Sequence, residues 1–207
     1  MQMAEEINPD DLEVGDELIA ERKKLDLNNL PNDMPEWMAK TIRFIDTMSY
    51  WIGKTVCWLL IPMCLSMVYE VIARKFFVAP TMWAYDISRM FYGALFTLGA
   101  GYALMRGVHI RADFIYRNWS DKTQGMVDAA LYLFFYFPGL LVFMWMSIDY
   151  AWTAIDRGER GMDTAWMPYM GPIKSALPVG ILFLLIQGVS EFLKSYYAAT
   201  RGRWPDR

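Results

Sequence analysis

Apolar residues along the chain collect in four long blocks, which charged segments separate. The hydrocarbon core of a bilayer is about 30 Å thick, and a helix needs about 20 apolar residues to cross it. A backbone in lipid must also satisfy its own hydrogen bonds, which favours helices. The pattern therefore predicts an all-α integral membrane protein. We expect four transmembrane helices, over about 51–73, 83–105, 125–150 and 173–194, within a membrane domain of residues 51–197.

Polar segments flank this predicted membrane domain. Residues 1–36 are acidic and rich in turn-forming residues, so we expect a mobile leader there. Residues 37–50 carry apolar side chains at helical spacing with Lys40 and Arg43 between them. This pattern predicts an amphipathic N-terminal helix that lies at the membrane interface. Residues 198–207 form a basic tail, which we expect in the cytoplasm.

Prolines and one serine mark local features of the predicted helices. Pro62 lies in the middle of the first span, and Pro138-Gly139 lies within the third. Proline removes a helical hydrogen bond, so we expect a kink or a bend at both places. Ser120 precedes Asp121-Lys122 and predicts the N-cap of the third span's helix.

Charge is distributed unevenly, although the formal net charge is only −3. Residues 1–36 carry eleven acids and three bases, whereas the rest of the chain has a net positive charge. Lysine and arginine favour the cytoplasmic side of a membrane, and their distribution predicts that both termini are cytoplasmic. The bases form no stripe of the kind that binds nucleic acid, so we expect no nucleic-acid partner.

The chain offers little for catalysis. Its two cysteines, Cys57 and Cys64, lie on one face of one helix but too far apart along it to bond each other. The single histidine, His109, excludes bis-histidine haem ligation within the chain. The sequence shows no phosphate-binding glycine loop, metal-ligand cluster or Ser/His/Asp arrangement. We therefore predict no catalytic residue, no metal and no cofactor.

The strongest local feature is a charge group around the first hairpin. Glu70 and Arg74 end the first span at i,i+4 spacing, and Asp86 and Arg89 begin the second at i,i+3 spacing, just after Trp83. The short connection puts both pairs at the same depth. Charge inside a span costs roughly 2.5–3.5 kcal/mol on insertion scales, so pairing is expected. These five residues predict either an ion-pair lock or a contact surface for a partner. An ion path would need deeper polar groups.

A stripe of mostly small residues runs down the second predicted span. Arg89, Gly93, Thr97 and Gly101 follow one another at steps of four. Small residues let helices approach closely, so the stripe predicts a helix-packing seam, either internal or to another subunit. A substrate site would need convergent polar groups, which the seam lacks.

The segment after the second span is polar and ends on the predicted cytoplasmic side. It contains Arg106, Gly107, His109, Arg111 and Asp113. A lone histidine there could act as a pH switch. Alternatively, it caps a helix or bonds a neighbouring carboxylate, and we favour this structural role.

Several of these segments, taken in order, resemble the small membrane subunit of tripartite ATP-independent periplasmic (TRAP) transporters. The resemblance covers about Trp51 to Phe192, and Asp86 stands where the family more often has Glu. It rests on Glu70–Phe77, Ala79-Pro80, Trp83–Arg89, Gly99 and Gly107–Asp113. A second set resembles the subgroup labelled mannitol/chloroaromatic: Gly158-Glu159-Arg160, Pro172-Ile173-Lys174, Pro178 and Gln187–Phe192.

The resemblance implies a function and a set of partners. The chain would sit in the bacterial inner membrane among its lipids as the small permease subunit of a sodium-driven symporter. A larger membrane subunit would move the substrate, an organic anion such as a carboxylate, and a periplasmic binding protein would deliver it. The small subunit would widen the scaffold of the large one and offer part of the docking surface.

Two other functions remain open at this point. The chain could be the membrane-anchor subunit of a redox enzyme complex, although its one histidine lies far from the span centres. It could also be a sensor or assembly factor with the acidic leader as a cytoplasmic arm. An unassisted transporter would need substrate and ion ligands near the bilayer midplane, and the sequence shows none.

Overall fold

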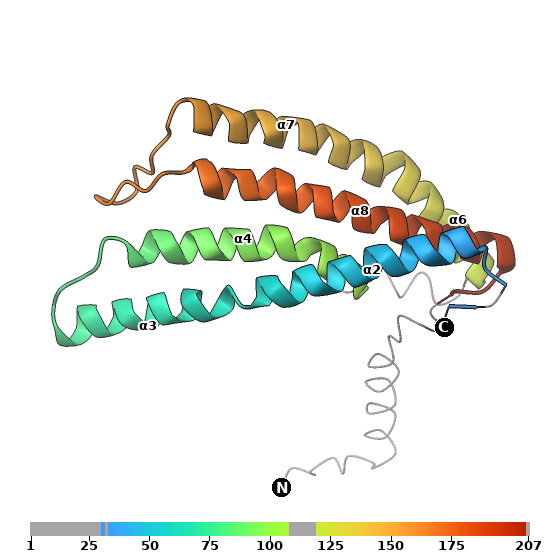
Figure 1. The fold of residues 1–207 in the computed structure, drawn as a ribbon, viewed down its shortest axis with the longest axis horizontal. Coiled ribbons are helices and arrows are strands. Elements are labelled where there is room, and N and C mark those ends of the chain that lie inside the picture. Colours follow the sequence, from blue (N-terminus) through green and yellow to red (C-terminus); the bar gives the residue numbers. More distant parts are fainter. Residues whose placement is uncertain (1–29, 32, 108–118, 206–207) are drawn as a thin grey trace, which may run out of the picture.

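The computed structural model describes residues 30–31, 33–107 and 119–205, and they form helices and no strand. Toward the α3–α4 connection the helical rods lie side by side in a row, and toward the other end α2 also reaches α8 (Figure 1). The first rod is α2 and α3, the second is α4, the third is α6 with α7, and the fourth is α8. The expectation of an all-α membrane protein is confirmed. The leader expected over residues 1–29 lies outside the described residues.

The first rod consists of α2 (Glu36–Cys57) and α3 (Leu60–Phe76), with a break at Trp58-Leu59. Pro62 has no N–H to offer the Trp58 carbonyl, which accepts instead from Ile61 N at 3.2 Å. The kink expected from Pro62 therefore falls one turn before it. The helix is continuous across residue 50, where the sequence suggested a boundary between an interfacial helix and the first span. One buried face runs from Met38 to Gly53 and continues across that point.

The third rod contains a local change of helix type. It runs through α6 (Asp121–Leu131), a π-helical segment (Tyr132–Tyr136) and α7 (Phe137–Asp156). The Ser120 side chain accepts from Thr123 N at 3.4 Å, which confirms the predicted N-cap. The π turn lies just before Pro138, where a helical donor is missing, and the rod curves along this part (Figure 1).

The fourth rod, α8 (Gly171–Arg201), is central to the fold. It packs against α2, α4 (Ala84–Met105), α6 and α7, whereas α3 packs mainly on α4. The connections α3–α4 and α7–α8 lie at one end of the row (Figure 1). At the other end an ion pair joins Arg203 to Asp33, so the first and the last described segments lie together there. We call these the loop end and the terminal end.

Several polar side chains lie inside the protein, and many large apolar ones are exposed. Gln187 and Asp86 are fully buried, whereas Trp145 is 79% exposed and Phe135 is 75% exposed. This inverted distribution suits a protein whose solvent is lipid.

Three helical stretches of the described residues are long and apolar enough to cross a membrane. They are Glu36–Phe76, Asp121–Asp156 and Gly171–Arg201. The α4 helix is also long, with 22 residues, but it is not among these three stretches. The fourth span therefore stays a prediction.

Small residues set the distance between the central helices. A Cβ added at Gly180 of α8 would lie 2.5 Å from the carbonyl oxygen of Thr97 in α4. A Cβ at Gly101 of α4 would lie 3.3 Å from the Phe183 carbonyl oxygen of α8. Each helix thus places glycine against the backbone of the other, which permits close packing.

We predict that Gly180→Ala destabilises the protein by roughly 1–3 kcal/mol, because the Thr97 backbone it would meet cannot move cheaply. Thermal unfolding of the detergent-solubilised chain measures this change. The control is Gly99→Ala in α4, where an added Cβ meets nothing within 4 Å. Equal midpoints for the two variants would contradict the close α4–α8 contact.

Candidate functional site

At the loop end, Glu70 ties the end of α3 to the connection that follows. Its carboxylate accepts from Arg74 Nη2 at 2.6 Å and from Thr81 N at 3.0 Å, and the Thr81 hydroxyl also donates to it. The Glu70 side chain is 16% exposed, whereas that of Arg74 is 69% exposed. The acid is thus bound within the protein while the base reaches outward.

Asp86 belongs to a different set of contacts. Its side chain is fully buried, accepts from the Thr164 hydroxyl and lies 3.5 Å from Arg89 Nη2. Arg89 also pairs with Asp163. Asp163 and Thr164 belong to the α7–α8 connection, so these contacts fasten the start of α4 to a distant loop. Among the described residues no ion pair joins this group to Glu70 and Arg74.

Trp83 lies between the two charged groups along the chain. Its ring stacks on Tyr69 of α3, with ring centroids 5.5 Å apart. The hairpin therefore has an aromatic contact beside its ion pairs.

The small-residue stripe of α4 faces α8 along much of its length. Gly101 and Thr97 lie against Phe183 and Gly180, and Gly93 is nearest to Ile173. The Thr97 hydroxyl donates to the Gly93 carbonyl at 2.8 Å, so it is used within its own helix.

The segment after α4 is only partly described. Arg106 Nε donates to the Tyr102 hydroxyl at 3.0 Å, and Gly107 has φ +65°, the left-handed conformation that glycine adopts without strain. His109, Arg111 and Asp113 lie outside the described residues.

A buried polar cluster that was not predicted from the sequence lies between α2 and α8. Its centre is Asp46, whose Oδ1 accepts from Gln187 Nε2 at 2.9 Å and from the Ser190 hydroxyl at 2.7 Å. The Ser49 hydroxyl donates to Gln187 Oε1 at 2.6 Å. All four side chains are buried. Gln187 therefore forms hydrogen bonds with two polar residues of α2, Asp46 and Ser49, at the same time. These bonds fix the register of α2 against α8.

Charged groups complete this cluster toward the terminal end. Lys194 Nζ lies 2.9 Å from Asp46 Oδ2 and 3.0 Å from Glu191 Oε1. The ammonium group of Lys194 and the carboxylates of Asp46 and Glu191 are all buried. Together with Ser49, Gln187 and Ser190, these three residues form what we call the Asp46 cluster.

A signal for the Asp46 cluster was present in the sequence. Gln187, Ser190, Glu191 and Lys194 stand at i, i+3, i+4 and i+7, which is one face of a helix inside an apolar block. Polar residues on one face of a membrane helix point toward a partner helix. The partner, Asp46, could not be identified without the fold.

The architecture defines a class of protein, and a comparison with known families identifies its family. Rods of apolar helices with a polar interior define an α-helical membrane protein. The family model described as "Tripartite ATP-independent periplasmic transporters, DctQ component" matches residues 63–196. The match covers well over half of the chain, and the chain belongs to this family. No curated protein and no solved structure matched it.

The family is one of transporter components, and it agrees with the resemblance noted in the hairpin and in the segment after it. It gives no support to a redox-anchor function. The matched region contains α4, α7 and most of α8, and therefore both the Asp86 contacts and Gln187 to Lys194.

We predict that Lys194→Met destabilises the protein strongly, because it removes the ammonium group between two buried carboxylates. Breaking a buried ion pair from one side costs roughly 3–5 kcal/mol. The matched control is Lys40→Met, whose partner Glu36 and own side chain are largely exposed. Thermal unfolding in detergent should show a large fall for Lys194→Met and little change for the control. Similar midpoints would show that the Asp46 cluster does not hold α2 to α8.

Proposed function

We propose that this chain is the small permease subunit of a sodium-driven TRAP transporter and the scaffold partner of its large transport subunit. The family match over residues 63–196 carries this proposal. The substrate would be an organic anion such as a carboxylate, chosen by a periplasmic binding protein. These finer points rest on the family resemblance of the sequence.

Polar side chains between the helices form hydrogen bonds within the protein. This supports a scaffold role over a substrate path. Gln187 is bonded to Asp46 and Ser49, and the Thr97 hydroxyl is bonded within α4. The Tyr136 hydroxyl donates to the Leu184 carbonyl at 2.7 Å. A transport path needs polar groups that are free to bind substrate and ions near the midplane. In the described part of the chain, these three groups are already occupied.

Four charge-free stretches support four membrane crossings. They cover residues 55–69, 90–105, 129–148 and 175–190, one in each rod. Each is bounded by charged residues at both ends, as expected for segments that lie in a hydrocarbon core. We therefore propose that α4 crosses the membrane with the other rods. Four crossings put both termini on the same side of the bacterial inner membrane. The distribution of lysine and arginine favours the cytoplasmic side for them, and the loop end is then periplasmic.

The charged loop end suits two roles at once. Asp86 is buried and contacts Thr164 and Arg89, which supports an ion-pair lock between α4 and the α7–α8 connection. Arg74 and Asp163 have largely exposed side chains, which supports part of a docking surface for the binding protein.

We predict that the chain co-purifies with the large membrane subunit when the two are expressed together. Substrate uptake in proteoliposomes should require both subunits, the periplasmic binding protein and a sodium gradient. Uptake by the purified chain alone would contradict the scaffold role.

We predict that Arg89→Ala lowers uptake several-fold, because it leaves the buried Asp86 without its guanidinium and frees the α7–α8 connection. Arg203→Ala is the matched control, since Arg203 also pairs with an aspartate but at the terminal end. Uptake should be compared at equal amounts of assembled complex. Equal uptake by the two variants would contradict a special role of the loop-end charges in transport.

A further inference from the structure

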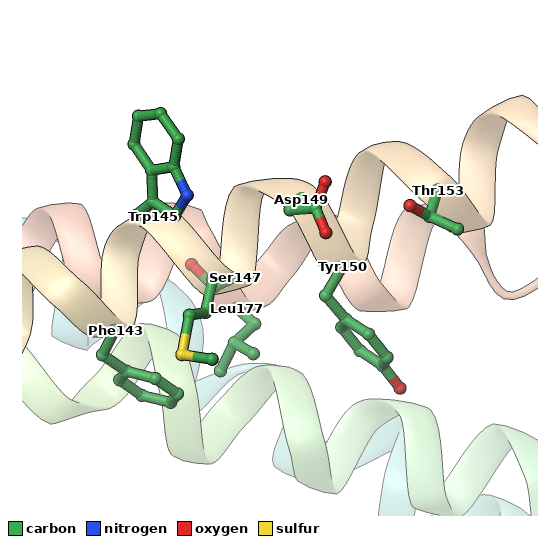
Figure 2. Close-up of a pocket in the computed structure, with 8 residues that line it drawn as sticks. Phe143, Trp145, Ser147, Asp149, Tyr150, Thr153 and Leu177 are labelled. Carbon is green, nitrogen blue, oxygen red and sulfur yellow. The ribbon is translucent and has the colours of Figure 1, made fainter.

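One flank of α7 carries an open groove of about 630 Å³. Residues of α7 form most of its lining, and Leu177 of α8 contributes the rest. Figure 2 shows Phe143, Tyr150 and Leu177 on the side where α7 faces its neighbours, with Trp145 on the opposite side. The volume lies within the roughly 300–1,000 Å³ of pockets that hold small molecules.

The groove changes character along its length. The part of the groove farther from the loop end is lined by Phe143, Met146 and Leu177. The part nearer the loop end is lined by Asp149 and Thr153. The helix rises about 1.5 Å per residue, so the polar and apolar parts are separated by about one to two turns. A ligand that fits both parts must have a polar head and an apolar body.

Asp149 gives the polar part its chemistry. It is exposed, and no hydrogen bond or ion pair engages it within the described residues. Asp149 directly follows the charge-free stretch 129–148, which places its carboxylate where hydrocarbon gives way to head groups. A carboxylate at that depth is stabilised by a cation or by hydrogen-bond donors.

The nearest base on α8 is already engaged. Lys174 Nζ lies 2.5 Å from Glu159 Oε2 and 4.1 Å from the centre of the Tyr150 ring. Its side chain is only 11% exposed. The groove therefore presents an acid without a base, and a free phosphate or an anionic head group would meet repulsion from Asp149.

We propose that this groove binds a phospholipid with a primary ammonium head group, such as phosphatidylethanolamine. The ammonium donates to the Asp149 carboxylate, the Thr153 hydroxyl lies within the head-group region, and an acyl chain lies along Phe143, Met146 and Leu177. A quaternary ammonium carries no N–H donor, so phosphatidylcholine binds less well, and phosphatidylglycerol lacks the cation. The amphipathic gradient of the lining favours a lipid over a helix of a partner protein.

Native mass spectrometry of the purified full chain with each of these three lipids tests the proposal. We expect phosphatidylethanolamine to remain bound at the highest occupancy. Asp149→Asn should weaken that binding about tenfold, as expected for the loss of one charge-assisted hydrogen bond. Asp156→Asn is the matched control, because Asp156 ends the same helix outside the groove and should leave lipid binding unchanged.

Met146→Trp fills the apolar part of the groove and should lower the occupancy of all three lipids. Met146 is 65% exposed, so this change leaves the helix contacts intact. Equal retention of the three lipids, or unchanged binding by Asp149→Asn, overturns the proposal. Unchanged lipid binding with lost co-purification of the large subunit would show instead that a protein helix occupies the groove. These readouts do not depend on uptake, so they stand apart from the proposed transport function.

Discussion

Lipid hydrocarbon offers polar side chains no hydrogen-bond partner, and the structure depends on this constraint throughout. Between helices in lipid there is little hydrophobic driving force, because lipid tails are as apolar as leucine. Polar contacts and close packing must therefore hold the rods together. The fully buried side chains accordingly include Gln187, Asp86 and Ser190, whereas Trp145 and Trp152 of α7 are largely exposed.

Polar contacts fasten the row at both ends, and small residues bring it together in between. The Asp46 cluster joins α2 to α8 at the terminal end, and the Asp86 contacts join α4 to the α7–α8 connection at the loop end. Between them, Gly180 and Gly101 allow α4 and α8 to approach closely. This division keeps the buried charges toward the two ends of the helices and leaves the middle to van der Waals packing.

Local features were predictable from the sequence, and long-range partners were not. The apolar blocks, the kink near Pro62 and the cap at Ser120 depend on neighbouring residues, and the structure shows all three. Asp86 also accepts a hydrogen bond from Thr164, which is 78 positions away, so no spacing rule could connect these two residues. The polar face of α8 was visible, but only the fold pairs it with Asp46.

A row of rods leaves more apolar surface to be covered by its surroundings than a closed bundle does. In a closed bundle each helix hides one face from lipid, whereas here α3 packs mainly on α4 and α7 mainly on α8. The outer rods therefore expose apolar surface that only lipid or another membrane subunit can cover. The central helix α8 has 31 residues and contacts α2, α4, α6 and α7, so a bend in it would disturb all four contacts together.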